Sequence, residues 1–189
     1  MTKITEMAEI AKMKELTKFI EGYRDEVYTD SRGYLTVGVG HKLTKAELQR
    51  YHEGQKLPKQ LLDKWLDADL LKAKEKIASK WNYNLNTPMG RVVWYLCYNI
   101  GITGLFNFKR FRTAYEDGDL VGMLRELGDS LWSQQVPRAY RIVTNYLIFD
   151  KLREHKIKFA DCPDGLRQSL GAQCRVKGIA RLLECCFTM

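Results

Sequence analysis

Apolar residues at the start of the chain are spaced with the period of an α-helix. Up to Ile20 they recur three and four residues apart, with no proline among them. Gly22 follows, and glycine commonly ends a helix in the left-handed conformation. We therefore predict a helix whose last turn holds Glu21. The apolar stripe of residues 2–11 is shifted relative to the stripe that follows it. Three alternatives therefore remain open for this helix: it starts late, it is broken, or it carries an added N-terminal turn.

Beyond Gly22 the apolar positions alternate, as they do in β-strands. Residues 27–29 and 34–39 predict two strands, and the turn-favouring residues 30–33 lie between them. The pattern therefore predicts a β-hairpin with Asp30 at the start of its turn.

One face of the second predicted strand is nearly bare of side chains, because Thr36 shares it with glycines such as Gly38. Glycine within a strand often marks a place where a ligand or another backbone comes close. We therefore expect Gly38 to contact substrate and Asp30 to reach over this open face.

Two carboxylates on opposing elements are what hydrolysis of a glycosidic bond requires. One carboxyl group protonates the leaving oxygen, and the other acts as nucleophile or as base for a water. Glu21 and Asp30 are the candidates for these roles. Each alone also fits a plainer interpretation, Glu21 as a charged residue on a helix surface and Asp30 as a turn aspartate that bonds its own backbone.

The spacing of these residues carries a family resemblance. Glu21, Asp30 and Thr36 have eight and five residues between them, and the runs Gly38-Val39-Gly40-His41 and Leu43-Thr44 follow. This combination resembles the active-site segment of the phage-type lysozymes, the muramidases of glycoside hydrolase family twenty-four. The resemblance extends over roughly residues 15–150.

The resemblance implies a role for each matching residue. Glu21 matches the general acid, Asp30 the carboxylate that activates the attacking water, and Thr36 the hydroxyl that helps to hold this water. Hydrolysis would then invert the anomeric centre. His41 matches a histidine that pairs with an aspartate on the following long helix, for which we choose Asp69, and this pair would be structural.

Helical patterns occupy most of the remaining chain. We predict helices over residues 46–51, 58–81, 87–100, 119–132 and 137–155.

Three residues in these helices match family positions near the substrate. Tyr98 and Asn99 lie where the family has an aromatic residue and an amide beside bound sugar, so both are candidate substrate contacts. Core packing is the rival interpretation of Tyr98, because aromatic residues at helical spacing usually belong to a core. Arg138 matches an arginine near the catalytic glutamate, and this chain lacks one residue before it.

These features predict an α+β fold that is mostly helical, with the two-lobed architecture of lysozymes. The catalytic domain would span residues 1–150, with a small β-hairpin lobe at about 22–58, a connecting helix at about 58–81 and a helical lobe from 87. Residues 151–189 would form a basic, cysteine-rich helical extension that packs on the helical lobe or continues it.

The net charge of +8, from 31 basic and 23 acidic residues, favours acidic partners. Bacterial cell wall, anionic membrane surfaces and nucleic acid all fit that charge, and so does a generic basic surface. The family resemblance implies peptidoglycan as the partner among these, and we expect no nucleic acid and a monomer.

The sequence contains no apolar run of the ~18 residues that span a membrane, and residues 1–14 have no signal-peptide core. We therefore expect no membrane insertion. We expect synthesis in the cytoplasm and release or secretion to the periplasm or cell wall through a holin, a phage tail or a secretion machine. An immunity or delivery protein would be a further partner on such a route.

We expect no cofactor and no metal. The five cysteines include no Cys-x-x-Cys pair, and the three histidines show no metal-ligand spacing. The odd number of cysteines predicts free thiols, with a bridge in an oxidising compartment as the alternative. Residues 128–131 spell the Gly-Asp-Ser-Leu signature of an esterase family but fall late in a helical pattern, and residues 38–40 lack the βαβ context of a dinucleotide loop.

The sequence thus predicts a peptidoglycan hydrolase that cleaves the β-1,4 bond between N-acetylmuramic acid and N-acetylglucosamine. A non-catalytic wall-binding protein on the same fold is an alternative, but such a protein has no need of Glu21, Asp30 and Thr36 together. A lytic transglycosylase is a further alternative, because it would use Glu21 without a water held by Asp30.

Overall fold

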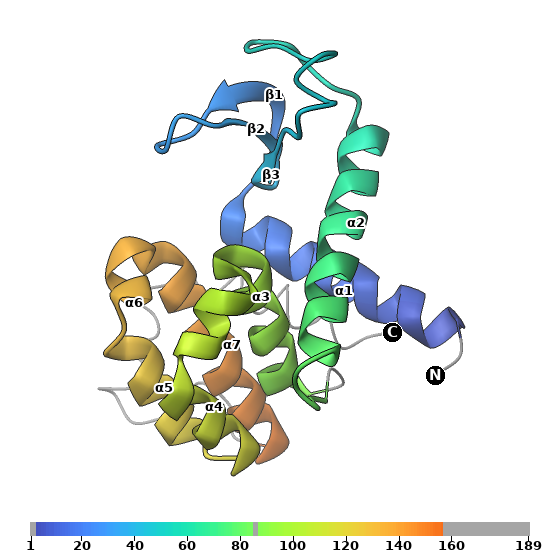
Figure 1. Cartoon of the computed structure of the whole chain (residues 1–189). Coiled ribbons are helices and arrows are strands. Elements are labelled where there is room, and N and C mark those ends of the chain that lie inside the picture. Colours follow the sequence, from blue (N-terminus) through green and yellow to red (C-terminus); the bar gives the residue numbers. More distant parts are fainter. Residues whose placement is uncertain (1–2, 85–86, 157–189) are drawn as a thin grey trace. The chain divides into compact units, whose positions relative to one another are not determined.

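The computed structural model describes residues 3–84 and 87–156 of the 189 residues. The described residues form seven helices and one three-stranded antiparallel sheet (Figure 1). The predicted fold class, α+β and mostly helical, is confirmed. The chain falls into two compact units, Met1–Asn82 and Tyr83–Met189, which we call unit 1 and unit 2.

Unit 1 begins with the helix α1 (Lys3–Glu21), which is continuous. Leu16 and Ile20 are buried, as their spacing indicated. Gly22 ends the helix with a φ of +83°, and its N–H donates to the carbonyl oxygen of Lys18 over 2.9 Å. Of the alternatives for the N-terminal stripe, the late start and the break are therefore wrong.

The predicted hairpin is present and gains a third strand. The strand β1 (Arg24–Thr29) pairs antiparallel with β2 (Leu35–Gly38), and β2 pairs with β3 (His41–Lys42). Gly38 and Gly40 have φ angles of +68° and +83°, a left-handed region that glycine enters without the steric cost other residues meet. The two glycines turn the chain back along β2, which the alternating pattern did not predict.

β1 contains a bulge. Arg24 lies opposite Gly38 and Tyr28 lies opposite Thr36, so four steps along β1 match two steps along β2. A bulge bends the strand and increases its twist. On its other edge this part of β1 is hydrogen-bonded to residues 54–57, which satisfies backbone groups that β2 leaves unpaired. The two ends of β1 are therefore closer than in a regular strand of the same length.

The helix α2 (Lys59–Ala78) contacts the sheet through Leu62. A Cβ atom added to Gly38 would lie 3.7 Å from Leu62, which is ordinary van der Waals contact. Gly38 is buried there, and Thr36 is only 3% exposed, so the expectation of an open face on β2 is wrong. The left-handed conformation of Gly38 breaks the alternation of faces on which that expectation depended. Leu62 shares a buried cluster with Val27, Val37, Leu43 and Leu57.

The short helix predicted over residues 46–51 is absent. Residues 45–50 form consecutive turns, such as the one closed by the bond from the N–H of Leu48 to the carbonyl of Thr44 over 2.9 Å. The next segment pairs with β1, since the N–H of Leu57 donates to the carbonyl of Asp25 over 2.8 Å.

The described part of unit 2 consists of helices packed around large apolar side chains. The helices are α3 (Pro88–Asn107), α4 (Lys109–Glu116), α5 (Leu120–Gly128), α6 (Leu131–Gln135) and α7 (Pro137–Glu154). Fully buried side chains in their core include Trp94, Tyr95, Phe111 and Tyr146.

Two helices of unit 2 differ from the prediction. α3 continues past Ile100 through a kink at Gly101, where φ is +74° and ψ is 169°. The helix predicted over 119–132 is split, because Ser130 is the N-cap of α6 and its side chain accepts the N–H of Ser133 at 3.1 Å. The same capping role accounts for the serine of the Gly-Asp-Ser-Leu signature.

Most of the predicted C-terminal extension, residues 157–189, lies outside the described residues, together with four of the five cysteines. The remaining cysteine, Cys97, is a buried thiol. None of the described helices combines the length and apolar character that a membrane span needs.

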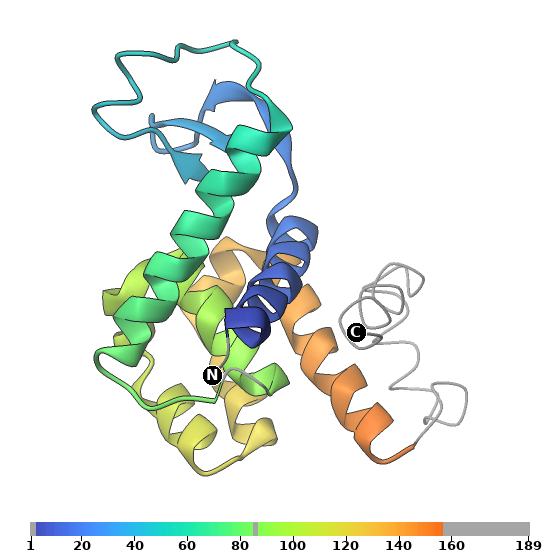
Figure 2. The same cartoon turned by 90° about the vertical axis from the view of Figure 1, so that its right-hand side faces the viewer.

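Two ion pairs join α1 to α2 within unit 1. The Nζ atoms of Lys14 and Lys18 each lie 2.7 Å from a carboxylate oxygen, of Asp67 and Asp63 respectively. The pairs are four residues, about one turn, apart on both helices. The order of the pairs is reversed between the two helices, which run in opposed directions in the view of Figure 2 and cross at a steep angle in that of Figure 1. The two pairs hold the end of α1 that carries Glu21.

We predict that Lys18 and Asp63 are energetically coupled. A double-mutant cycle with Lys18→Met and Asp63→Asn should give a coupling of about 0.5–1 kcal/mol in the free energy of urea unfolding, because the pair is partly exposed. Burial would raise the pKa of Asp63, but Lys18, Lys14 and Lys59 outweigh it and lower this pKa. A lowered pKa stabilises the fold at neutral pH, so the coupling should disappear as acid protonates Asp63 in the folded state.

The control for this cycle is Glu75→Gln, which removes one negative charge from an exposed position on α2. It should show no coupling to Lys18→Met. Equal coupling for Glu75 and Asp63, or none for either, would contradict a specific pair.

Candidate functional site

Glu21 and Asp30 lie at the two ends of β1 in unit 1. Glu21 is the last residue of α1 and is exposed, and Asp30 directly follows β1. The bulge shortens the path between them, because the stretch from Arg24 to Tyr28 is matched by two steps of β2. Two strand steps span only about 7 Å. The bulge thus makes the path along β1 between the two carboxylates shorter than in a regular strand.

The carboxylate of Asp30 has backbone and side-chain partners. Its Oδ1 accepts the backbone N–H groups of Arg32 at 2.9 Å and Tyr34 at 2.8 Å, and its Oδ2 lies 3.6 Å from the Nζ of Lys42. The bond from Tyr34 does most to lower the pKa of Asp30, burial opposes it, and Arg32 and Lys42 lower this pKa further. Asp30 therefore both closes the turn and presents an ionised carboxylate at neutral pH.

Glu53 anchors the residue before Asp30. Its Oε1 accepts the backbone N–H of Thr29 at 3.1 Å and the Thr29 hydroxyl at 2.7 Å. The N–H of Asp30 donates to the carbonyl of Tyr34 over 2.8 Å. These bonds fix the backbone on both sides of the Asp30 carboxylate.

Thr36 lies on β2, where it pairs with Tyr28 on one side and Lys42 on the other. Its hydroxyl donates to the carbonyl of Tyr34 over 3.1 Å. A hydroxyl that donates in this way keeps its oxygen lone pairs as acceptors. Thr36 can therefore accept a hydrogen bond from a water next to it.

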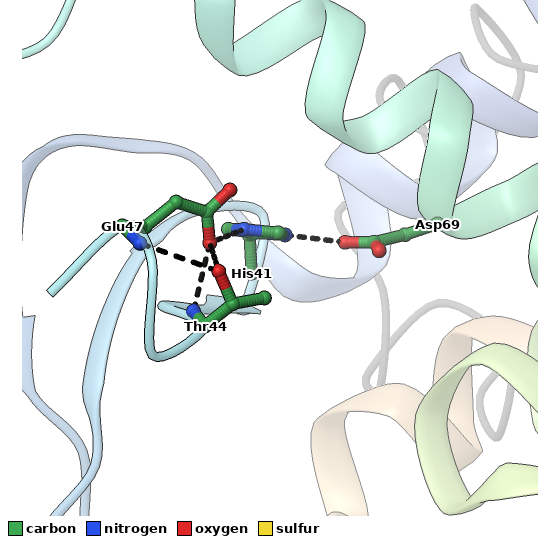
Figure 3. Close-up of polar contacts among 4 residues, drawn as sticks. All are labelled: His41, Thr44, Glu47 and Asp69. Atoms are coloured by element: carbon green, nitrogen blue, oxygen red, sulfur yellow. Dashed lines mark hydrogen bonds and ion pairs between the residues drawn. The ribbon is translucent and has the colours of Figure 1, made fainter.

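His41 is the centre of a second polar cluster (Figure 3). Its Nδ1 lies 2.6 Å from Oδ2 of Asp69 on α2, the partner that we chose, and its Nε2 lies 3.2 Å from Oε2 of Glu47. The ring stacks on Trp65, with the ring centroids 4.7 Å apart. Ionised carboxylates only accept, so a ring that donates to both is the protonated imidazolium.

Glu47 connects His41 to the turns at residues 45–50. Its Oε2 also accepts the N–H and the hydroxyl of Thr44, each at 2.7 Å, and the N–H of Glu47 donates to the Thr44 hydroxyl oxygen over 3.4 Å. This reciprocal pattern is that of a capping box. Burial would raise the pKa of Glu47, but its bonds with Thr44 and His41 lower it. His41 thus joins β3, these turns and α2.

The other predicted contacts lie in unit 2. Asn99 is on α3, and its Oδ1 accepts a bond from Nε1 of Trp132 over 2.9 Å, which fixes the orientation of the amide. Tyr98, on the same helix, is partly exposed. Arg138 is exposed in the first turn of α7. The structure thus divides the predicted site residues between the two units.

Sequence reasoning missed Lys42, Glu47 and Glu53. The run Thr44-Lys45-Ala46-Glu47 matches a capping-box signature, which could have identified Glu47. Lys42 and Glu53 act through the third strand and the loop that pairs with β1, for which the sequence gives no local signal. Within the described ranges, no group of three or more His, Cys, Asp or Glu side chains is arranged to hold a metal ion.

The charge of His41 makes a pH-dependent contribution to stability. Burial alone would lower the pKa of His41, but the contacts with Asp69 and Glu47 outweigh it and raise this pKa. The imidazolium therefore stabilises the fold fully below the unfolded pKa of about 6.5. That contribution is lost as the pH rises through the folded pKa.

We predict that His41→Asn lowers the free energy of unfolding by about 1.5–3 kcal/mol below about pH 6, the range for hydrogen bonds to charged groups. The loss should shrink as the pH is raised through the folded pKa of His41. The molecules that remain folded should keep most of the wild-type activity. Urea unfolding at a series of pH values measures the first two effects, and cell-wall lysis normalised to folded protein measures the third.

The matched control is His52→Asn, because His52 is exposed in the same unit and its ring contacts the backbone carbonyl of Glu53 at 3.1 Å. It should change stability little at any pH. A His41→Asn variant as stable as the wild type would show that the cluster does not support the fold.

Comparison with known proteins gives a family and several distant relatives. The sequence profile of the phage lysozyme family matches residues 18–143, which is more than half of the chain. Probable T4-type lysozyme 1 of Dictyostelium discoideum is 23% identical over 158 residues, which cover 71% of this chain and 93% of that protein. Probable T4-type lysozyme 2 of the same organism is 22% identical over 170 residues, 78% of this chain and 99% of that protein.

A phage structural protein is also similar. The pre-baseplate central spike protein Gp5 of Enterobacteria phage T4 is 25% identical over 169 residues, which cover 77% of this chain and 29% of the spike protein. The family match begins just before Glu21 and includes the hairpin, α2 and most of the described part of unit 2. The predicted family is confirmed, and the chain belongs to the phage lysozyme family.

Proposed function

We propose that this protein is a peptidoglycan hydrolase that cleaves the β-1,4 bond between N-acetylmuramic acid and N-acetylglucosamine with inversion. Membership of the phage lysozyme family supports a glycoside hydrolase that acts on peptidoglycan. The observation that carries the finer proposal is the Asp30 carboxylate, held by two backbone N–H groups and Lys42 at one end of a bulged strand. The helix end with Glu21 adjoins the other end of that strand.

In this proposal Glu21 is the general acid and Asp30 the general base. Glu21 donates its proton to the glycosidic oxygen, which leaves with N-acetylglucosamine. Asp30 accepts a proton from a water whose oxygen attacks C1 of N-acetylmuramic acid from the opposite face. Thr36 accepts a hydrogen bond from the same water, a role its lone pairs allow while the hydroxyl donates to Tyr34.

The remaining site residues have binding or supporting roles in the proposal. Asn99 would present an amide oriented by Trp132 to the polar groups of the sugar, and the partly exposed ring of Tyr98 would pack on the sugar. Gly38 is buried against Leu62 and would offer backbone groups only. Arg138 is proposed as a supporting residue, together with His41 and Asp69.

Peptidoglycan is the proposed partner, reached in the periplasm or cell wall after release or secretion from the cytoplasm. The net charge of +8 favours association with an acidic polymer. The similarity to a phage spike protein supports delivery as part of a larger assembly as one proposed route. An immunity or delivery protein remains a proposed partner on that route.

We predict that digestion of purified peptidoglycan by the wild type releases muropeptides that end in reducible N-acetylmuramic acid, as read by mass spectrometry. Glu21→Gln should reduce the rate at least 100-fold, because general acid catalysis contributes about 10² or more. Asp30→Asn should be nearly as damaging, because an amide can still accept the two turn hydrogen bonds but cannot take up a proton.

The matched controls are Glu15→Gln on α1 and Asp25→Asn on β1, both at exposed positions. They should keep nearly full activity. More than about one-tenth of the wild-type rate in Glu21→Gln would contradict its role as the acid. Products with anhydro ends would indicate a lytic transglycosylase, and no products from the wild type would indicate wall binding without catalysis.

A further inference from the structure

Lys42 lies beside the carboxylate that we propose as the catalytic base. Its Nζ is 3.6 Å from Oδ2 of Asp30 and 4.1 Å from the centre of the Tyr34 ring. The ammonium group thus contacts a carboxylate and an aromatic ring, both of which attract a cation. Three residues of the hairpin are brought together in this way.

The backbone fixes the origin of the lysine side chain. Lys42 is directly opposite Thr36 in the β2–β3 register, and the third strand exists because the chain turns back at Gly38 and Gly40. The N–H of Leu43 donates to the carbonyl of Leu35 over 2.9 Å, which continues the pairing past Lys42. The lysine is therefore carried by a paired strand and not by a loose loop.

We propose that Lys42 is a positioning residue of the hydrolysis proposed above, which aligns the Asp30 carboxylate and extends its ionised range, and with it the activity, to lower pH. This inference rests on the proposed function. Lys42 acts through Asp30 and does not itself take part in bond cleavage.

The charged groups around Asp30 come from each element packed near it. Lys42 on β3 faces Oδ2 directly, and Arg32 in the turn contacts Oδ1 through its backbone N–H. Glu53, from the loop that pairs with β1, is held by Thr29 next to Asp30. Lys42 thus supplies a side-chain cation at Asp30, and Glu53 is bonded to the neighbouring residue, Thr29.

Loss of the Lys42 charge should shift the pKa of Asp30 in a defined direction. Without the ammonium group the pKa of Asp30 should rise, so the base becomes protonated at a higher pH and activity is lost earlier on acidification. At neutral pH Asp30 stays ionised, so the rate should change much less. A purely structural role would instead lower the rate similarly at every pH.

We predict that Lys42→Met moves the acid limb of the kcat/KM profile to higher pH, measured on soluble peptidoglycan fragments. Methionine keeps an unbranched side chain that can still pack on Tyr34. Lys42→Arg should restore the wild-type limb, and Lys45→Met, which removes a charge from an exposed neighbouring position, should leave it in place. The difference between wild type and Lys42→Met should shrink in about 1 M salt, which screens exposed charges.

An acid limb that stays in place in Lys42→Met, or moves equally in Lys45→Met, would overturn the proposal. The second measurement is an NMR titration of the Asp30 carboxyl carbon, which reports the coupling without catalysis and should shift to higher pH in Lys42→Met alone. An unchanged titration in an active enzyme overturns the role of Lys42 only. A wild type that releases no reducing ends overturns the proposed function, and the role of Lys42 with it.

Discussion

The positions of both carboxylates of the proposed site depend on the helix α2, which packs against the elements that carry them. One stripe of α2 presents Asp63 and Asp67 to lysines of α1, and another presents Leu62 and Asp69 to the sheet. The direct covalent connection between α1 and the Asp30 turn is the bulged strand β1, which is short and bent. Packing against α2 therefore does more than the connection through β1 to fix the spacing of the two carboxylates. The two ion pairs are partly exposed and contribute about 1 kcal/mol or less each, so the buried cluster and the His41 contacts carry much of this support.

Asp30 shows how one fold can give a carboxylate a defined protonation state. A turn aspartate ordinarily bonds its own backbone, and Asp30 does so through Oδ1. The same bonds favour the ionised form, and Lys42 adds a positive charge at Oδ2. The structural role and the proposed chemical role are thus produced by the same contacts. A base in an inverting glycosidase needs to be ionised before the water attacks.

The sequence predicts local features of this protein well. The end of α1 at Gly22 and the hairpin follow from spacing and from the conformational preferences of single residues, and the contact of His41 with Asp69 was expected from the family resemblance. These features are set by residues close in the chain or by a motif long enough to be specific.

Features that depend on contacts between distant segments could not be predicted in this way. The bulge in β1 is accompanied by pairing of its outer edge with residues 54–57, and residues 45–50 form turns in place of the helix expected over 46–51. The face of β2 is covered at Thr36 and Gly38 and not open as expected, because Gly38 leaves the regular strand conformation and packs on Leu62. No local sequence pattern indicates that Lys42 lies beside Asp30, because this contact depends on a third strand that two left-handed glycines create.

The most direct test of the proposed mechanism is the stereochemistry of the first product. Proton NMR during digestion of a soluble peptidoglycan oligosaccharide resolves the anomers of the new reducing end before they equilibrate. In the proposed mechanism, Asp30 activates a water that attacks from the face opposite Glu21. The β-linked substrate should therefore give the α-anomer of N-acetylmuramic acid first. Initial formation of the β-anomer would mean retention through a covalent or equivalent intermediate, and it would contradict the assignment of Asp30 as a general base.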